Sequence, residues 1–586
     1  MLYSKIPLAQ TVIQLCKAKN IQHIVISPGS RNAPLTIGFT NDPYFTCYSI
    51  VDERCAGFFA LGIAQQIESP VALVCTSGSA LLNYYPAISE AFYSNIPLVV
   101  LSADRPRYLV GIGDGQTINQ KDVFANHILF SANLRLNFEH APKNLNESEP
   151  AIIRSIENKL ERMLGVKQEL DEENETKINT AINRAVLSNG PVHINIPFEE
   201  PLYETTETPI ANPKVIDVEV KKKKIDDFFI QECYDDWNSY PKKMILVGAN
   251  KPDQVEQKIL DELAKDTSVI VLTETTSNIH NKQFFNSIDK LIAPLTEEEF
   301  KDLQPDILVT FGGLIVSKKI KGFLRKFQPK HHWHIDKKSA NDTFFCLDKH
   351  IEATPNQFFN SLLPRLTHFV KSDYSSYWNE IRAKRKEKHK EYVENIPFSD
   401  FKVFDIVINN LPEQLVLQLG NSSAIRYSQL FDLNKNIPVF CNRGTSGIDG
   451  STSTAIGCSK AHKKPTVLIT GDLSFFYDSN ALWNNYIPNN FRIIIINNQG
   501  GGIFRILPGH KDNKKFDTYF ETTHKLSAKH LCKMYELDYV SASNEKQLKT
   551  LLKTFFNESD QPRVLEIFTP RTINDQVLLD YFKFIK

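Results

Sequence analysis

Short apolar runs alternate with longer stretches of mixed character along the first third of the chain. Runs at residues 24–26, 71–74 and 98–101 are each followed by turn-forming residues, and a similar run ends this block at 193–197. Bare apolar runs of this length are typical of strands that are buried on both faces in a parallel sheet. A segment of helical length, 80–94, lies between two of them. The block is therefore expected to form an α/β domain.

The same alternation continues in two further blocks. Their expected strands are runs at 244–247, 269–272, 307–309 and 334–335, and then at 415–419, 439–440, 467–469 and 493–496. A polar, proline-containing stretch at about 203–225 is expected to be a linker, and a heavily charged helical stretch at about 372–395 leads into the third block. We predict an α/β protein of three doubly wound parallel-sheet domains, covering residues 1–203, 204–365 and 366–586.

Charge and composition narrow the class of protein. Lys plus Arg and Asp plus Glu are both 68, so the formal net charge is zero and generic nucleic-acid binding is not expected. No uncharged apolar run approaches 18 residues, and the N-terminus lacks the features of a signal peptide. The nine cysteines are scattered and form no CxxC motif. These features favour reduced thiols in a cytoplasmic protein.

Two conspicuous segments are expected to be structural. His332, His334 and Asp336 would share one face of a strand, as a metal site could require, but zinc usually recruits paired cysteines and Cys346 stands alone. A strand end is the favoured interpretation. The acidic, polar segment 138–178 is expected to form a surface helix and a loop.

The strongest chemical signal is Gly471-Asp472, followed 26 residues after the aspartate by Asn498. Each lies at the end of an apolar run, and the residues between them can hold one crossover helix, expected at 480–486. Both side chains should therefore lie at the carboxyl edge of one sheet, where ligands of α/β proteins bind. A carboxylate, an amide oxygen and a free carbonyl at Gly500 would suit octahedral Mg²⁺ completed by diphosphate and water. Glycine at position 500 would let the backbone approach closely.

This pattern resembles the GD…NN signature of thiamine diphosphate enzymes, with Leu473 replacing the usual second glycine. Further motifs match in order: Ser27-Pro28-Gly29-Ser30-Arg31, Asp52-Glu53-Arg54, Cys75-Thr76-Ser77-Gly78, Ala103-Asp104-Arg105-Pro106, Asn119-Gln120, Gly420-Asn421-Ser422, Asn442 through Gly450, and Gly471 through Asp478. Together they resemble the family of 2-succinyl-5-enolpyruvyl-6-hydroxy-3-cyclohexene-1-carboxylate synthases of menaquinone biosynthesis, in which the GDL variant is usual. The resemblance covers nearly the whole chain and is thinnest in the middle block.

The resemblance implies roles for individual residues in binding thiamine diphosphate and a Mg²⁺ or Mn²⁺ ion. Glu53 matches the catalytic glutamate that bonds the aminopyrimidine ring of the cofactor, whereas a surface ion pair with Arg54 is the plain alternative. Ile448 matches the apolar wedge that bends the cofactor, and a core isoleucine is its alternative. The implied cofactor-binding residues are Asn421, Ser422, Arg443, Ser446, Gly447, Ile448, Asp472, Leu473, Ser474 and Asn498. The implied metal ligands are Asp472, Asn498 and Gly500.

The family condenses two dicarboxylates, 2-oxoglutarate and isochorismate, and one carboxylate leaves as CO₂. Three carboxylates remain to be held, and arginine is the suitable bidentate partner. The residues that match substrate-binding positions are Ser30, Arg31, Arg105, Asn119, Gln120, Lys318, Lys319, Arg426, Ile503 and Phe504. The alternative for each arginine and lysine is an ordinary surface charge. The alternative for Ile503 and Phe504 is packing in the core.

The expected reaction is decarboxylation of 2-oxoglutarate and 1,4-addition of the succinyl unit to isochorismate, with the cofactor as electron sink. A pyruvate-using relative such as acetolactate synthase is the enzymatic alternative, and a regulatory subunit without catalysis is the non-enzymatic one. The resemblance also implies an obligate homodimer, or a tetramer built from two dimers, with sites shared between subunits.

Overall fold

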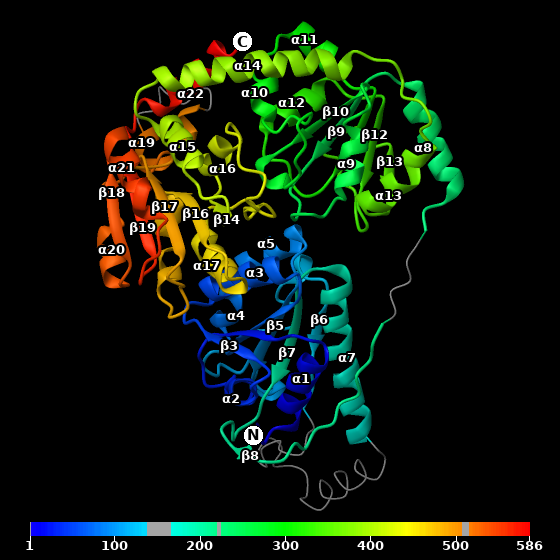
Figure 1. The fold of residues 1–586 in the computed structure, drawn as a ribbon. Coiled ribbons are helices and arrows are strands. Elements are labelled where there is room, and N and C mark those ends of the chain that lie inside the picture. Colours follow the sequence, from blue (N-terminus) through cyan, green and yellow to red (C-terminus); the bar gives the residue numbers. More distant parts are fainter. Residues whose placement is uncertain (1, 137–165, 219–223, 507–514) are drawn as a thin grey trace, which may run out of the picture. The chain divides into compact units, whose positions relative to one another are not determined.

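A computed structural model describes residues 2–136, 166–218, 224–506 and 515–586 of the chain (Figure 1). The chain forms two compact units. The first comprises Met1–Lys221 together with Ser453–His462 and Asn480–Ile487, and the second comprises Lys222–Thr452, Lys463–Ser479 and Pro488–Lys586. Two segments of the third predicted domain therefore belong to the first unit.

The first unit contains a parallel sheet with the strand order β3-β2-β4-β5-β7-β6. Its strands are β2 (His23–Ile26), β3 (Thr46–Ser49), β4 (Val71–Cys75), β5 (Leu98–Asp104), β6 (Ser131–Asn133) and β7 (Val192–Pro197). β4, β5 and β7 are buried along their whole length, which explains their continuous apolar sequences. A separate antiparallel pair joins β1 (Tyr3–Ser4) to β8 (Thr205–Thr206).

The second unit contains two more parallel sheets. The middle sheet has the order β10-β9-β11-β12-β13, and the last has the order β15-β14-β16-β17-β19-β18. The middle strands are β9 (Lys243–Val247), β10 (Val269–Thr273), β11 (Ile307–Phe311), β12 (His331–Ile335) and β13 (Lys349–Ile351). The last strands are β14 (Val416–Leu419), β15 (Val439–Phe440), β16 (Thr466–Gly471), β17 (Phe491–Asn497), β18 (Asp538–Ala542) and β19 (Arg563–Phe568).

The first and last sheets share one topology. Numbered by their appearance in each sheet, both have the strand order 2-1-3-4-6-5 with all neighbours parallel. The sequence alone did not establish that these two blocks share a fold. The structure shows that they are two copies of one architecture, so equivalent loops follow equivalent strands in both.

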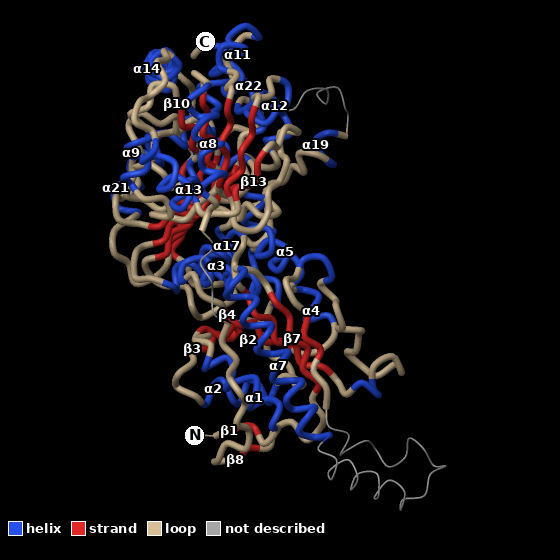
Figure 2. Tube along the Cα trace, turned by 90° about the vertical axis from the view of Figure 1, so that its right-hand side faces the viewer, coloured by secondary structure: helices blue, strands red, loops and turns tan. Residues whose placement is uncertain are grey.

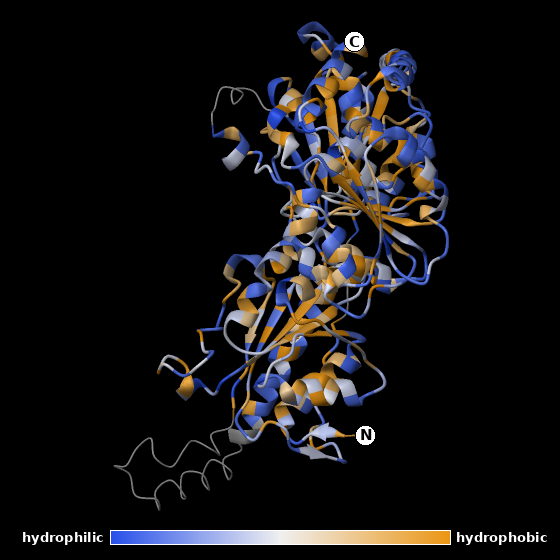
Figure 3. Cartoon of the chain, turned by 90° about the vertical axis from the view of Figure 1, so that its left-hand side faces the viewer, coloured by the Kyte–Doolittle hydropathy of each residue, from blue (hydrophilic) through white to orange (hydrophobic). Residues whose placement is uncertain are grey.

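Helices cover both faces of the sheets (Figure 2). In the first unit, α1 (Pro7–Ala18), α2 (Ala33–Asn41) and α7 (Val166–Ser188) bury apolar residues against one face, while α3 (Glu53–Ile67) and α5 (Tyr85–Ser94) lie on the other (Figure 1). α8 (Asp227–Ser239), α9 (Gln257–Leu263) and α13 (Pro355–Leu362) cover one face of the middle sheet, and α10 (Ile288–Ile292), α12 (Lys318–Lys326) and α14 (Tyr374–Asn395) cover the other. The last sheet packs against α15 (Asp400–Asn409), α16 (Ser423–Ser428), α21 (Glu545–Phe555) and α22 (Asn574–Phe584). The strands are the most hydrophobic elements (Figure 3).

The prediction of three doubly wound parallel sheets is confirmed, and each expected strand is present. Two helix predictions are wrong. Residues 80–94 form α4 (Ser79–Asn83) and α5, because Pro86 has no amide proton to continue the first helix. The crossover helix is α18 (Asp472–Tyr477), which begins at Asp472, and not 480–486. Residues 480–486 instead bond to the first unit. The amide of Asn480 donates to Asp52, and the hydroxyl of Tyr486 accepts from the backbone amide of Ser49.

The predicted structural segments can now be placed. His332 and His334 share one face of β12 and both contact the hydroxyl of Thr310. No cluster of three acidic, histidine or cysteine side chains suited to a metal occurs within the described ranges. Of segment 138–178, residues up to 165 lie outside the described residues, and the remainder belongs to α7.

In the part of the chain that is described, no helix is long and apolar enough to cross a membrane. None of the nine cysteines, all of which lie in the described ranges, forms a disulfide.

Candidate active site

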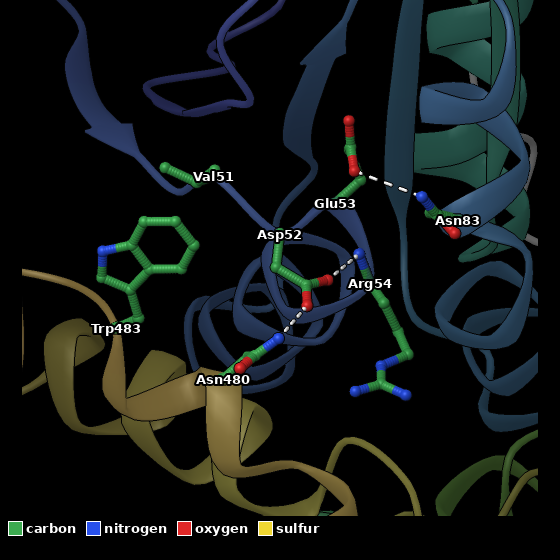
Figure 4. Close-up of a pocket in the computed structure, with 7 residues that line it drawn as sticks. All are labelled: Val51, Asp52, Glu53, Arg54, Asn83, Asn480 and Trp483. Carbon is green, nitrogen blue, oxygen red and sulfur yellow. Dashed lines mark hydrogen bonds between the residues drawn. The ribbon is translucent and has the colours of Figure 1, made fainter.

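The first unit presents a pocket around Glu53 (Figure 4). Val51, Asp52, Glu53, Arg54, Asn83, Asn480 and Trp483 line it. Asp52 caps α3 through the amides of Arg54 and Cys55, and its second oxygen accepts a hydrogen bond from Asn480 over 2.9 Å. Glu53 accepts a longer bond of 3.3 Å from Asn83. Its carboxylate points away from the guanidinium of Arg54 (Figure 4), so the arrangement does not favour an ion pair between them.

Loops at the carboxyl edge of the same sheet carry the predicted cations of this unit. Arg31 follows β2 and is buried, with bonds of 3.2 Å to the carbonyl of Phe198 and to the carboxylate of Glu200. Arg105 follows β5 and donates to Asp114 over 2.6 Å and to Ser77 over 2.8 Å. Burial is the largest effect on the pKa of the nearby Asp104 carboxyl and raises it, whereas both arginines lower it.

Gln120 belongs to a buried polar network and not to an open surface. Its carbonyl oxygen accepts from the amide of Gly78 over 2.9 Å, and its amide donates to Asn195 over 2.7 Å. Asn195 in turn donates to Asp104 over 2.8 Å. The side chain of Gln120 is therefore largely committed to the scaffold, whereas Ser30 and Asn119 are exposed.

The second unit contains the Gly-Asp motif. Asp472 is the first residue of α18, directly after β16, and is buried. One carboxylate oxygen accepts from the amide of Leu473 over 2.7 Å, and the other accepts from the amide of Gly500 over 3.0 Å. Nε2 of His524 lies 3.2 Å from the second oxygen. Because β16 and β17 are neighbours in the sheet, the two motifs meet at its carboxyl edge as predicted.

Asn498 follows β17 and is also buried. Its Nδ2 donates to Asp400 over 2.8 Å, while its Oδ1 is buried and has no hydrogen-bond partner among the described residues. Burial raises the pKa of Asp400 to about 6, which leaves the carboxyl ionised at neutral pH. A buried amide oxygen without a partner is costly unless a ligand satisfies it.

These groups fit a hard divalent cation, since one carboxylate and one orphaned amide oxygen are the ligand types that Mg²⁺ prefers. The expectation of a free carbonyl at Gly500 is wrong, because this oxygen accepts from the amide of Gly502 over 3.0 Å. A carbonyl oxygen has a second lone pair, so it can still serve as a ligand. Residue 500 has φ of +152°, and a Cβ there would lie 2.7 Å from the carbonyl oxygen of Glu521. Only glycine suits this position.

The predicted diphosphate loop is held together by Asn421. Its amide donates to the carbonyls of Asn442 and Gly447, both over 2.7 Å, and its oxygen accepts from Arg443 over 2.8 Å. The side chain of Asn421 therefore shapes the loop and has no amide proton left for a phosphate. Ser422, with φ of +67°, is the N-cap residue directly before α16, and its carbonyl accepts from Arg426 over 2.7 Å.

The remaining predicted residues of this unit surround the same edge. Ser474 donates to the carbonyl of Ile448 over 2.6 Å, which joins α18 to the loop that contains Ser446 and Gly447. Ile448 and Phe504 are each 37% exposed, so neither is a core residue. Ile503 and Phe504 belong to a 3₁₀ turn, Gly502–Ile506. Leu473 is half-buried.

Several buried acids that sequence reasoning missed hold elements that carry predicted site residues. Glu521 is fully buried and accepts from Arg505 and Arg571, which anchors the turn carrying Phe504. Glu274 follows β10 and accepts from the amides of Val316 and Ser317 over 2.7 and 2.8 Å. It thereby holds the start of α12, where Lys318 and Lys319 are exposed. No local sequence signal distinguishes these buried acids from surface ones.

Known proteins are similar to this chain over its whole length. Residues 6–124 match the family model for the N-terminal TPP binding domain of thiamine pyrophosphate enzymes, 219–418 match their middle domain, and 420–567 match their C-terminal TPP binding domain. A 2-succinyl-5-enolpyruvyl-6-hydroxy-3-cyclohexene-1-carboxylate synthase of Flavobacterium psychrophilum is 56% identical, with both chains covered completely. The chain belongs to this synthase family.

Other members of the synthase family are also similar over their whole length. The synthase of Christiangramia forsetii is 57% identical with both chains covered completely, and that of Porphyromonas gingivalis is 35% identical over 98% of this chain and 96% of its own. The chain is thus a thiamine pyrophosphate-dependent enzyme of the synthase type. The resemblance recognised in the sequence motifs is confirmed.

Proposed function

We propose that this enzyme decarboxylates 2-oxoglutarate and adds the resulting four-carbon unit to isochorismate in a 1,4 manner, releasing CO₂ in menaquinone biosynthesis. The observation that carries the proposal is the identity of 56% and 57%, over complete chains, to synthases that bear the name of this product. When bound, thiamine diphosphate supplies the nucleophilic carbon and the electron sink for decarboxylation. The proposed compartment is the cytoplasm, and the absence of disulfides among the nine cysteines supports it.

The metal residues we propose are Asp472, Asn498 and the carbonyl of Gly500. Support comes from the 3.0 Å bond between Gly500 and Asp472 and from the buried amide oxygen of Asn498. Mg²⁺ or Mn²⁺ would be held here together with diphosphate oxygens. The diphosphate itself would lie against the start of α16 at Ser422 and against the loop that contains Arg443, Ser446 and Gly447. Leu473, Ser474 and Ile448 complete the proposed cofactor surface.

Glu53 is the proposed catalytic residue. Its carboxylate would exchange a proton with a ring nitrogen of the aminopyrimidine, which is the type of step that a positioned carboxylate assists. Only one oxygen of the Glu53 carboxylate is bonded in Figure 4, to Asn83 over 3.3 Å. Asp52 is less suited to this role, because both of its oxygens are engaged in bonds within the protein.

We propose Arg31, Arg105, Arg426, Lys318 and Lys319 as partners for the three carboxylates that remain after CO₂ leaves. Each charge-assisted hydrogen bond contributes about 1.5–3 kcal/mol. Ser30, Asn119, Ile503 and Phe504 are exposed or half-exposed and would contact substrate directly. Gln120 would act through the network that holds Gly78.

We further propose a homodimer in which Glu53 of one subunit completes the site formed by the metal residues of the other. The argument rests on the family resemblance and on two-fold symmetry, which gives two equivalent sites. Pairing of two such dimers into a tetramer would leave these sites unchanged.

A coupled assay tests the proposed function. Purified enzyme is supplied with 2-oxoglutarate, isochorismate, thiamine diphosphate and Mg²⁺, and CO₂ and the condensation product are measured. We expect turnover without any protein partner. Turnover of pyruvate instead, with a flavin-coloured preparation, would favour the acetolactate synthase alternative. Turnover of neither substrate would refute the proposed function.

A further inference from the structure

A buried acid that no motif singled out lies behind the proposed metal site. Asp400 is the first residue of α15 and is 2% exposed. It precedes Asn498 by 98 residues, so the two meet only through the fold. Nothing in the proposed catalytic steps uses this carboxylate.

The contacts of Asp400 fix its position firmly. Its Oδ2 accepts from Nδ2 of Asn498 over 2.8 Å, and its Oδ1 accepts from the hydroxyl of Thr569, after β19, over 2.6 Å. Its backbone amide donates to Asn574 over 2.8 Å. Asp400 is therefore bonded to Asn574 at the start of α22 and to Thr569 after β19. Through its other oxygen it binds the side chain of Asn498 after β17.

The chemistry of this contact determines how the amide of Asn498 is turned. The two ends of a carboxamide are nearly the same in shape and differ only in hydrogen bonding. An ionised carboxylate can only accept, so it selects Nδ2 and turns Oδ1 to the opposite side. Gly502 lies close against this side chain, because a Cβ there would be 3.1 Å from Nδ2. The buried Oδ1 then has no partner among the described residues.

We propose that Asp400 is a positioning residue that fixes the amide of Asn498 with Oδ1 toward the divalent cation. A reversed amide would point its two partly positive N–H groups at the cation, which would repel it. This inference rests on the proposed metal site and adds a residue outside the ligand set. Partners of this kind typically change metal affinity by about 10–100-fold when they are replaced.

The test measures cofactor binding and not turnover. Binding of thiamine diphosphate is followed by calorimetry at a series of Mg²⁺ concentrations for the wild type, Asp400→Asn and Thr569→Val. The substituted carboxamide can offer either its oxygen or its nitrogen, so the orientation of Asn498 is no longer selected. We expect the Mg²⁺ concentration for half-maximal binding to rise about 10–100-fold in Asp400→Asn. Thr569→Val, which keeps the bond to Asn498, should stay near the wild type.

A second pair of variants separates orientation from charge. Asn498→Asp presents an oxygen on both sides, so it needs no orienting partner. Asp400→Asn should then cause no further loss in the Asn498→Asp background, because the carboxamide introduced at position 400 can donate to the new carboxylate. An equal loss in both backgrounds would mean that Asp400 attracts the cation through its charge, and the positioning assignment would be wrong.

The remaining outcomes also decide the question. A folded Asp400→Asn enzyme with unchanged Mg²⁺ dependence would overturn the inference alone, whereas wild-type enzyme that binds no cofactor with Mg²⁺ would refute the proposed function. If Asp400→Asn does not fold, a crystal structure of the wild type with cofactor and metal gives the answer. Oδ1 of Asn498 on the metal and Nδ2 on Asp400 is the expected result, and an Asn498 side chain away from the metal is the contrary one.

Discussion

The amide of Gly500 donates a hydrogen bond to Oδ2 of Asp472 over 3.0 Å. This bond links the turn after β17 to the start of α18, so the two motifs predicted to share one metal are in direct contact. It also means that the aspartate shapes the turn in addition to its proposed role as a ligand.

Replacement of Asp472 by alanine should abolish Mg²⁺-dependent cofactor binding. The change removes the only anionic protein ligand of the proposed set, and Mg²⁺ is bound through few carboxylates together with phosphates. Calorimetry of thiamine diphosphate with and without Mg²⁺ measures the effect. Binding as tight as that of the wild type would contradict the metal assignment.

Replacement of Glu53 by glutamine should lower kcat by about 10²–10⁴-fold. Glutamine keeps the shape and can still accept from Asn83, but it cannot carry a proton. Steady-state kinetics measures the loss, and circular dichroism and cofactor binding should show an intact fold. Asp52→Ala is a useful comparison, since it removes the side-chain cap of α3 and should lower the free energy of unfolding by about 0.5–2 kcal/mol. Near-normal turnover of Glu53→Gln would exclude the proton-transfer role.

Mixed subunits test the proposed sharing of sites. Glu53→Gln and Asp472→Ala homodimers should both be inactive, whereas a heterodimer has one site with both lesions and one site with neither. Differently tagged subunits are co-expressed, and the heterodimers are purified. By symmetry they should recover up to about half of the wild-type activity. Heterodimers as inactive as their parents would show that each chain forms its own site.

A close helix crossing in the first unit should be intolerant of side chains. A Cβ at Gly62 of α3 would lie 2.1 Å from the carbonyl oxygen of Thr454 in α17 (Ser451–Ala461). Gly62→Ala should therefore destabilise the protein by about 1–3 kcal/mol or more, because the backbone must move. Gly322→Ala in α12 is the matched control, since nothing lies within 4 Å of its Cβ. That variant should be neutral or more stable by about 0.5–1 kcal/mol in denaturant unfolding.

His193 should make the protein sensitive to acid. Burial lowers its pKa to about 3, and its Nε2 contacts the hydroxyl of Ser102 at 2.7 Å. The pKa of this imidazole is therefore near 6.5 in the unfolded chain and about 3 in the folded one, so stability is lost as pH falls between these values. The contribution is at most about 1.4 kcal/mol per pH unit.

His193→Gln should remove this part of the pH dependence. Denaturant unfolding at about pH 7.5 and about pH 5.5, on either side of the ordinary histidine pKa, is compared for the variant and the wild type. His389, whose pKa is also lowered to about 3 by burial, remains in both proteins, so the difference between them isolates His193. An identical loss of stability in both proteins would contradict the assignment.

Local pattern in the sequence was enough to predict the sheets and to place the two motifs, Gly471-Asp472 and Asn498, at one sheet edge. Continuous apolar runs predicted the strands, because parallel strands buried on both faces tolerate little else. Gly471-Asp472 and Asn498 could be assigned to one edge, because parallel strands in one sheet end on the same side. Pro86 also indicates a helix boundary, although one continuous segment at 80–94 was predicted.

Tertiary structure decided the rest. Asp400, Glu521 and Glu274 have no sequence signal, because burial and partners that lie far away in the chain give them their roles. The same holds for Asn480 and Tyr486, whose segment follows α18 in the chain but packs on the first unit. By itself, the sequence determined which chemistry-bearing groups end each strand. The direction in which each group faces depends on contacts that only the folded chain brings together. The same contacts decide which buried acid holds it there.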